Sequence, residues 1–125
     1  MKEGVILLGH GSRREEANNL VRDICSILQE RDSDKKYVSA FLEFGAPSLP
    51  DAAKDLIEEG AERIVVAPMF LTMGNHMHRD IPGKLLRLKT THPDVRFAFA
   101  KHLGADPRIA DIVMDRVTEA SDLIE

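Results

Sequence analysis

The chain has 125 residues, of which 43% are hydrophobic and 30% charged, and its formal net charge is −4. These values indicate one globular domain spanning residues 1–125, and the scattered basic residues exclude nucleic acid as a principal partner. No apolar run approaches the roughly 20 residues that cross a bilayer. Because the N-terminus also lacks a signal-peptide pattern, we expect a cytoplasmic protein with no membrane partner.

The first apolar run, residues 4–8, predicts a buried strand, and a helical pattern follows at 14–31. The apolar residues of this helix recur on one side, which we expect to be buried. They are Ala17, Leu20, Val21, Ile24 and Leu28. Cys25 lies beside them, so the single cysteine is expected to be a buried, inert thiol rather than half of a disulfide.

A second strand is predicted at 37–42, after a polar surface loop. Ser48, with an acidic residue three positions later, has the spacing of a capping box and predicts a helix over 49–59. Gly60 follows as the glycine that ends this helix.

The third strand is predicted at 63–67, where a continuous β-branched run is typical of a strand buried on both faces. A polar, methionine-rich loop follows at 69–79. Asp80 then has the chemistry of a helix N-cap, and Pro82 is tolerated in a first turn, so a third helix is expected to extend to about Lys89.

The last strand is predicted at 96–100, and Pro107 opens a fourth helix. Apolar spacing in this helix is carried by Ile109, Ile112, Val113, Val117 and Ala120. A chain that alternates strand and helix four times predicts an α/β fold, with a four-stranded parallel sheet flanked by helices on both faces. So small a sheet leaves open edges, which favour dimerisation or coverage by a partner.

Polar side chains follow every predicted strand. In a parallel sheet these positions share the carboxyl edge, where ligands bind in open α/β folds. The residues concerned are His10, Ser12, Arg13, Glu43, His76, His78, Arg79, Lys101 and His102. Four of the five histidines therefore fall at one edge, and the glycines beside His10 let another group approach closely.

Histidine and carboxylate together suit a first-row divalent metal such as Co²⁺, Ni²⁺, Fe²⁺ or Zn²⁺. The same groups suit proton abstraction near neutral pH. A functional role is favoured most for His10, which lies between two glycines, and for Glu43, whose carboxylate lies among apolar neighbours.

Four segments in this order resemble the class II tetrapyrrole chelatases, in particular their short archaeal CbiX-type branch. They are Gly9-His10-Gly11-Ser12-Arg13, Phe41-Leu42-Glu43-Phe44-Gly45-Ala46-Pro47-Ser48, Val66-Ala67-Pro68-Met69-Phe70-Leu71, and Gly74-Asn75-His76-Met77-His78-Arg79-Asp80-Ile81-Pro82. The match covers nearly the whole chain.

The resemblance implies a chelatase-like, flavodoxin-like half domain that forms a homodimer with the cleft between subunits. It implies a lyase that inserts Co²⁺ into sirohydrochlorin on the way to cobalamin (vitamin B12), releasing two protons. His10 and His76 match the metal-binding and catalytic histidines, and Glu43 matches the acidic residue. Cobalt or nickel is then a substrate, and no permanently bound cofactor is expected.

The tetrapyrrole carries several carboxylates, and we expect Ser12, Arg13, Arg79 and Lys101 to bind it. His78 and His102 match no family position that assigns them a role. Nickel insertion for coenzyme F430 and iron insertion for siroheme remain open, as does a cobalt- or nickel-binding delivery module without turnover. A phosphohistidine enzyme would need arginine before His-Gly, where this chain has Gly9.

Overall fold

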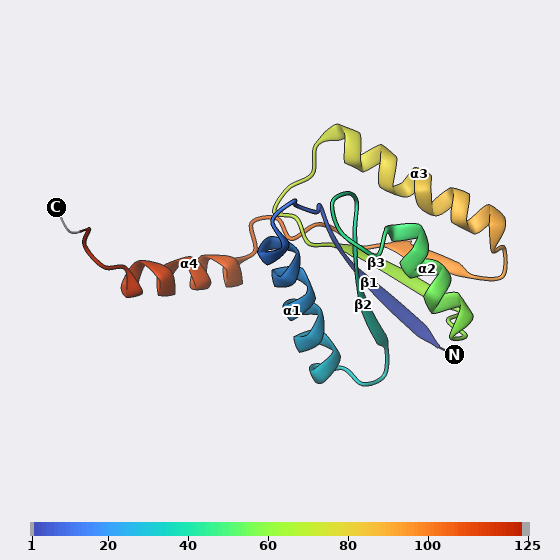
Figure 1. Ribbon diagram of the computed structural model, residues 1–125, viewed down its shortest axis with the longest axis horizontal. Coiled ribbons are helices and arrows are strands. Elements are labelled where there is room, and N and C mark those ends of the chain that lie inside the picture. Colours follow the sequence, from blue (N-terminus) through green and yellow to red (C-terminus); the bar gives the residue numbers. More distant parts are fainter. Residues whose placement is uncertain (1, 124–125) are drawn as a thin grey trace.

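The computed structural model describes residues 2–123 and has four strands that alternate with four helices (Figure 1). The elements are β1 (Glu3–Gly9), α1 (Glu15–Arg31), β2 (Lys36–Phe41), α2 (Leu49–Glu58), β3 (Arg63–Pro68), α3 (Asn75–Thr91), β4 (Arg96–Phe99) and α4 (Pro107–Glu119). The alternation predicted from sequence is confirmed. The predicted domain also includes residues 1, 124 and 125, which lie outside the described residues.

The strands form one parallel sheet in the order β2-β1-β3-β4. Figure 1 shows α2 and α3 on one face of this sheet and α1 on the other. Successive residues of β1 point to opposite faces of the sheet, so each face is covered by a different helix. A Cβ on Gly4 would meet Leu56 of α2, whereas one on Gly9 would meet Val21 of α1. The expected helices on both faces are confirmed.

The main core lies between the sheet and the pair α2 and α3. Ile6 and Leu8 of β1 and Ile64 and Val66 of β3 are completely buried there, and Ile81 of α3 packs against them. Ser48 caps α2 by accepting a hydrogen bond from the Asp51 amide at 3.2 Å, as its spacing predicted. Among the described residues, no helix is both long enough and apolar enough to cross a membrane.

The inward side of α1 differs from the prediction. Leu20 is 64% exposed and Ile24 is also exposed, whereas Asn18 and Cys25 are buried. The apolar pattern predicted the wrong side because a polar residue, Asn18, points inward. The helix is therefore rotated about its axis by part of a turn relative to the prediction. Cys25 is buried as expected, and burial raises the pKa of its thiol, which keeps it protonated.

The start of α3 is a second correction. Gly74 is the N-cap and the helix begins at Asn75, so His76 and His78 lie on its first turns rather than in a loop. Asp80 is inside the helix, and Pro82 lies more than a full turn beyond the start. The sequence pattern favoured Asp80 because a proline two residues after an acidic residue is typical of a first turn.

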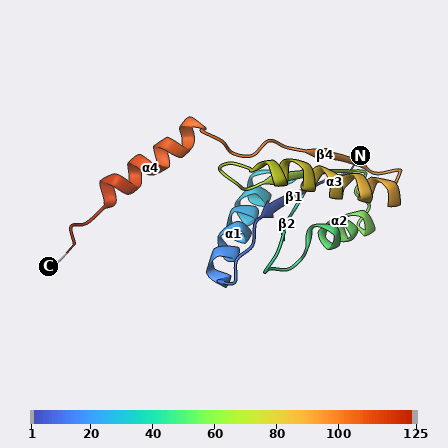
Figure 2. The ribbon, with the colours of Figure 1, turned by 90° about the horizontal axis from the view of Figure 1, so that it is seen from above.

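β3 also differs from the prediction, because only one of its faces is fully covered. Ile64 and Val66 are buried, but Val65 between them is partly exposed on the side of α1. The helix predicted after Pro107 forms as expected, with Asp106 as its cap, yet none of its residues, all of them described, is buried. Figure 2 shows α4 extending away from the sheet and the other helices.

Candidate active site at the carboxyl edge

The loops that follow the strands are tied to one another by backbone hydrogen bonds. The Glu43 amide after β2 donates to the His10 carbonyl after β1 at 3.2 Å. The Leu103 amide after β4 donates to the Phe70 carbonyl after β3 at 2.9 Å. The fold therefore fixes the backbone at the carboxyl edge, where the sequence placed its candidate residues.

His10 and Glu43 face each other across this edge. His10 Nδ1 lies 3.7 Å from Glu43 Oε1, and each side chain is 53% exposed. The ring of Phe70 lies on another side of the imidazole, with 6.1 Å between the ring centroids. The predicted histidine–carboxylate pair is thus brought together, open to solvent, with a small adjustment needed for a hydrogen bond.

Gly11 explains how the two loops approach so closely. Its φ is +98°, and a Cβ at this position would stand 1.6 Å from the Glu43 carbonyl oxygen. Any other residue would be strained and would push the loops apart. The room beside His10 is therefore used by the loop that carries Glu43.

Asn18 is a positioning residue that the sequence interpretation missed. Its side chain accepts a hydrogen bond from the Ser12 amide at 3.0 Å and donates to the Ser12 carbonyl at 3.0 Å. It also donates to the Phe44 carbonyl at 2.8 Å. One buried amide thus joins the loop of His10 to that of Glu43. The available signal was a polar residue one helical turn before Val21 and two turns before Cys25.

The histidines of α3 have different surroundings. His76 is 96% exposed, and its Nε2 lies 3.9 Å from Asp80 Oδ2, one helical turn away. His78 and His102 come from different elements and meet edge to face, with ring centroids 6.0 Å apart. The structure therefore places His76 on a free helix end, whereas His10 is held between two loops.

The predicted substrate-binding residues lie around the same edge. The Arg13 guanidinium stacks over the ring of Phe44, with its Cζ 4.7 Å from the ring centroid. The Ser12 hydroxyl accepts a hydrogen bond from the Arg14 amide at 3.1 Å. Lys101 lines a hollow of about 530 Å³ between the loop after β4 and the start of α4, and Arg79 is exposed on α3.

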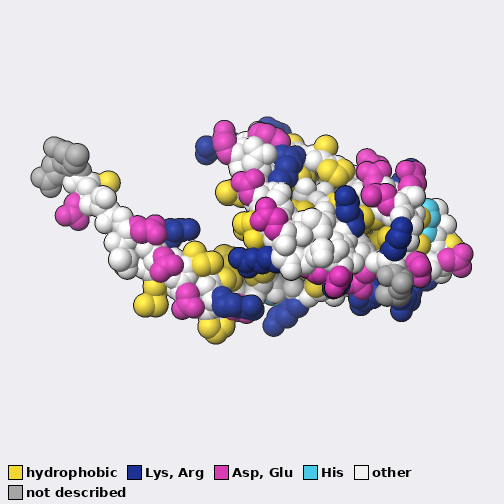
Figure 3. All heavy atoms as spheres, turned by 90° about the horizontal axis from the view of Figure 1, so that it is seen from below, with side chains coloured by type: hydrophobic (Ala, Val, Ile, Leu, Met, Phe, Trp, Pro, Cys, Tyr) yellow, Lys and Arg dark blue, Asp and Glu magenta, His cyan; other side chains and the backbone are white. Residues whose placement is uncertain are grey.

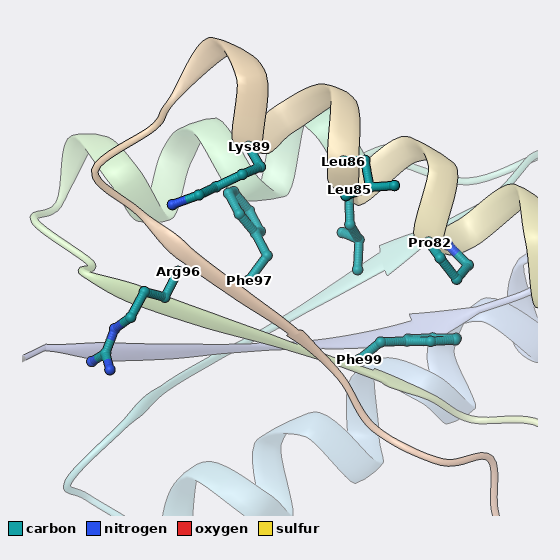
Figure 4. Close-up of a pocket in the computed structure, with 7 residues that line it drawn as sticks. All are labelled: Pro82, Leu85, Leu86, Lys89, Arg96, Phe97 and Phe99. Carbon is teal, nitrogen blue, oxygen red and sulfur yellow. The ribbon is translucent and has the colours of Figure 1, made fainter.

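A separate groove of about 420 Å³ lies between α3 and β4 (Figure 4). Its lining is mostly apolar and comprises Pro82, Leu85, Leu86, Lys89, Arg96, Phe97 and Phe99. It contains neither histidine nor carboxylate, so it does not have the ligands that a divalent metal requires.

Within residues 2–123 there is no group of three or more His, Cys, Asp or Glu side chains placed to hold a metal ion. The site of one chain therefore offers a histidine–carboxylate pair and one exposed histidine rather than a closed coordination cage.

The comparisons with known proteins agree with this arrangement. The sequence model of the CbiX family matches residues 4–120. The sirohydrochlorin cobaltochelatase of Methanopyrus kandleri is 35% identical, over 93% of this chain and 95% of that protein. The chloroplastic sirohydrochlorin ferrochelatase of Arabidopsis thaliana is 30% identical, over 98% of this chain and 55% of that protein.

Among solved structures, the sirohydrochlorin chelatase SirB of Bacillus subtilis subspecies spizizenii in complex with cobalt superimposes with a TM-score of 0.88. It is 25% identical, and the match covers 98% of this chain and 56% of SirB. This chain thus spans about half the length of SirB and of the plant enzyme, and nearly all of the archaeal one. The chain belongs to the CbiX family.

Proposed function

We propose that this chain is a sirohydrochlorin cobaltochelatase, a lyase that inserts Co²⁺ into sirohydrochlorin in cobalamin synthesis. The observation that carries the proposal is the His10–Glu43 pair at the carboxyl edge of a CbiX-family chain. The 35% identity to an archaeal sirohydrochlorin cobaltochelatase over nearly both lengths supports the same reaction.

His10 and His76 hold the incoming ion at the mouth of the site, each through a neutral imidazole nitrogen. As the ion enters the macrocycle, two pyrrole N–H bonds break and four nitrogen–metal bonds form, so two protons leave for each ion inserted. Glu43, beside His10, accepts these two protons one after the other and passes each to solvent, to which its side chain is open. Because protonated imidazole does not bind metal, activity falls at acid pH.

The tetrapyrrole binds through its carboxylates. Arg13 is held over Phe44 at the edge of the site, and Lys101 lines the adjacent hollow. Arg79 lies on the same helix as His76, and Ser12 lies on the loop of His10. These groups supply charge-assisted hydrogen bonds to the rim of the substrate while its central nitrogens face the histidines.

The active form is a homodimer of single-domain chains, with the macrocycle between the two subunits. A flat tetrapyrrole is large beside one domain of 125 residues, and the His10–Glu43 pair of a single chain is open to solvent. A second subunit supplies the opposite wall and excludes water from the reacting nitrogens.

The test is anaerobic absorbance spectroscopy of sirohydrochlorin with Co²⁺, Ni²⁺ or Fe²⁺, with and without the protein. We expect an enzyme-dependent spectral change that is fastest with Co²⁺, and a loss of about 100-fold or more in His10→Ala and His76→Ala. His92→Ala, at the far end of α3, is the matched control. Near wild-type rates in both active-site variants would refute these roles.

The same assay distinguishes the proposed function from the alternative functions. A fastest rate with Ni²⁺ or Fe²⁺ would assign the chain to coenzyme F430 or siroheme synthesis instead. Cobalt binding without acceleration by any metal would favour a delivery module, which the exposed His76 and the His78–His102 pair would also suit.

A further inference from the structure

Three loops at the carboxyl end of the sheet each expose one large apolar side chain. Phe44 after β2 is 49% exposed, Leu71 after β3 is 62% exposed, and Leu103 after β4 is 48% exposed. Figure 3 shows hydrophobic side chains along α4 as well, but that helix stands clear of the body of the molecule, and its residues, all of them described, include no histidine. The apolar side chains of the three loops, by contrast, share one edge with the candidate site.

The order of the strands places these side chains in a row that includes His10. The sheet runs β2-β1-β3-β4, so the loops after the strands present, in that spatial order, Phe44, His10, Phe70 with Leu71, and Leu103. The ring centroids of Phe70 and His10 lie 6.1 Å apart, and the Leu103 amide donates to the Phe70 carbonyl at 2.9 Å. Three strand spacings of about 4.8 Å give the row a length of about 14 Å. We call Phe44, Phe70, Leu71 and Leu103 the apolar row.

Phe44 differs from the rest of the apolar row in its backbone. Its φ is +51°, and in the part of the chain that the structure describes it is the single residue other than glycine with a positive φ. Two hydrogen bonds hold this conformation: the Glu43 amide donates to the His10 carbonyl at 3.2 Å, and Asn18 donates to the Phe44 carbonyl at 2.8 Å. A side chain with a Cβ is disfavoured in this left-handed region, where glycine and asparagine are the preferred residues.

The ring of Phe44 adds little to the core that would offset this strain. Half of the residue stays exposed, and it lies outside the buried cluster between the sheet and the pair α2 and α3. The contact that the ring does make is with a charge, because the Arg13 guanidinium lies over it with 4.7 Å between Cζ and the ring centroid. An exposed ring kept in a disfavoured conformation beside a candidate site indicates a role in ligand binding rather than in folding.

We propose that Phe44 binds the conjugated plane of the tetrapyrrole by stacking on one of its pyrrole rings, while Arg13 pairs with a carboxylate at the rim. A tetrapyrrole is apolar over its plane and charged at its edge, which matches an aromatic ring with a cation beside it. The rest of the apolar row contacts the remainder of the plane. Stacking next to Glu43 sets where the central nitrogens lie relative to His10. The inference rests on the proposed function and adds the residue that positions the plane of its substrate.

The neighbours of the apolar row favour a small ligand over a protein surface. The row is continuous with the His10–Glu43 pair, whose two side chains are half exposed. A protein segment packed onto the row would remove both polar groups from water without replacing their hydrogen bonds. A tetrapyrrole covers the row with its apolar plane and brings its central nitrogens to the same pair.

The first experiment measures binding of metal-free sirohydrochlorin to the full chain by anaerobic fluorescence titration. Phe44→Asn removes the ring and keeps a residue that accepts the left-handed conformation, so the dissociation constant should rise about 10-fold or more. Phe44→Tyr keeps the ring and should bind within about 3-fold of wild type. Leu20→Asn, which removes a side chain that is 64% exposed on α1, is the matched control and should bind as wild type does. Unchanged binding in Phe44→Asn, or equal losses in Phe44→Asn and Phe44→Tyr, would overturn the proposal.

Stability separates a ring that binds a ligand from one that supports the loop. Because asparagine relieves the left-handed strain and the ring is half exposed, Phe44→Asn should melt within about 3 °C of wild type. A large fall in melting temperature together with the loss of affinity would assign Phe44 to the structure of the loop instead. The molar mass of Phe44→Asn by light scattering should equal that of wild type. A changed mass with unchanged affinity would place Phe44 at a contact between subunits and would also overturn the proposal.

Kinetics test whether the ring acts by holding the substrate. Stacking is equally strong before and during metal insertion, so Phe44→Asn should raise KM for sirohydrochlorin about 10-fold and leave kcat within about 3-fold of wild type. KM for Co²⁺ should not change. The effect of Arg13→Gln on KM should shrink at high salt, which screens charge pairing, whereas the effect of Phe44→Asn should persist. A lower kcat with an unchanged KM would show that Phe44 acts through the position of Glu43, which contradicts stacking.

Binding and insertion are measured separately, so the two proposals can fail separately. Metal-free tetrapyrrole that stacks on Phe44 without insertion of any metal would refute the proposed function alone. A wild-type chain that inserts metal, with Phe44→Asn equal to it in affinity and KM, would refute stacking alone. A wild-type chain that does not bind the tetrapyrrole would refute both.

Discussion

The charged side chains at the amino end of the sheet are paired with one another, whereas those at the carboxyl end are open to solvent. At the amino end, Arg63 contacts Glu3 at 2.7 Å, and Lys35 bridges Glu3 and Asp32 at 4.0 and 3.3 Å. The Tyr37 hydroxyl completes this network by donating to Asp32 at 2.6 Å.

At the carboxyl end, His10 and Glu43 stand 3.7 Å apart and half exposed, and His76 is almost fully exposed. The same sheet therefore uses charge in two ways. Buried or half-buried charges that satisfy one another add stability to the fold, while charges whose side chains are more than half exposed are available to a substrate. Substitutions at the two ends should accordingly separate stability from activity.

Gly11→Ala should have the largest effect, because it distorts the backbone of the loops at the carboxyl end of the sheet. The new Cβ would meet the Glu43 carbonyl at 1.6 Å, in a backbone conformation that alanine disfavours. We expect a loss of at least about 3 kcal/mol in the free energy of unfolding, together with loss of activity. Urea unfolding followed by circular dichroism measures it.

Gly83→Ala is the control for this prediction. Gly83 lies inside α3 and a Cβ there meets nothing within 4 Å, so alanine should stabilise the protein by up to about 1 kcal/mol. If the two alanine variants were equally stable, the close approach of the two loops at Gly11 would be wrong.

Asn18→Ala should cost about 2–4 kcal/mol, because it removes three hydrogen bonds to the backbone and leaves the groups of Ser12 and Phe44 that made them unpaired. The His10 and Glu43 loops should then separate and metal insertion should slow. Asn19→Ala, on the exposed side of the same helix, should change stability by less than about 0.5 kcal/mol. Unfolding curves and insertion rates of both variants test this positioning role.

Glu43→Gln and Glu3→Gln compare the two ends of the sheet directly with the same chemical change. Glu43→Gln should reduce the rate of metal insertion by about 10–100-fold with little change in stability. Glu3→Gln should do the reverse: it weakens the contact with Arg63, costs about 1 kcal/mol, and leaves the rate unchanged. Similar effects of both substitutions on either property would contradict the separation of roles.

The sequence predicted the strands and the edge that carries the histidines because both depend on local patterns. β-branched runs mark the strands, and parallel topology sends every strand end to the same edge. Asn18 escaped prediction because the inward side of α1 was assigned from apolar residues alone. Its buried side-chain amide bonds to the loop just before α1 and to the loop after β2, and apolar spacing along the helix does not predict those bonds.

The first turns of α3 and the surroundings of α4 escaped prediction for different reasons. Pro82 was placed near the start of a helix because proline disfavours a helix interior, yet it lies inside α3, where it has no amide to donate. The apolar spacing of α4 was correct, but spacing shows only that one side of a helix requires a partner. Which surface meets that side depends on the path of the chain between Leu103 and Pro107.

The smallest predicted effect concerns Tyr37 at the amino end of the sheet. Its hydrogen bond to Asp32, with a contribution from burial, raises the pKa of Tyr37 to about 12, and the same bond lowers the pKa of Asp32. A raised pKa in the folded state stabilises the protein below the unfolded value near 10, and this stabilisation is lost as pH rises toward 12. A lowered carboxyl pKa stabilises above about pH 4 and is lost in acid.

Tyr37→Phe should therefore lower the melting temperature by about 2–4 °C between pH 5 and 9. Its difference from wild type should shrink above about pH 10 and below about pH 4, where one partner of the hydrogen bond changes charge. Thermal unfolding of both proteins across this range measures the difference, with Ser33→Ala in the adjacent loop as control. The insertion rate should not change, because the network at the amino end lies at the opposite end of the strands from the histidines. A slower rate in Tyr37→Phe would show that the two ends are coupled through the sheet.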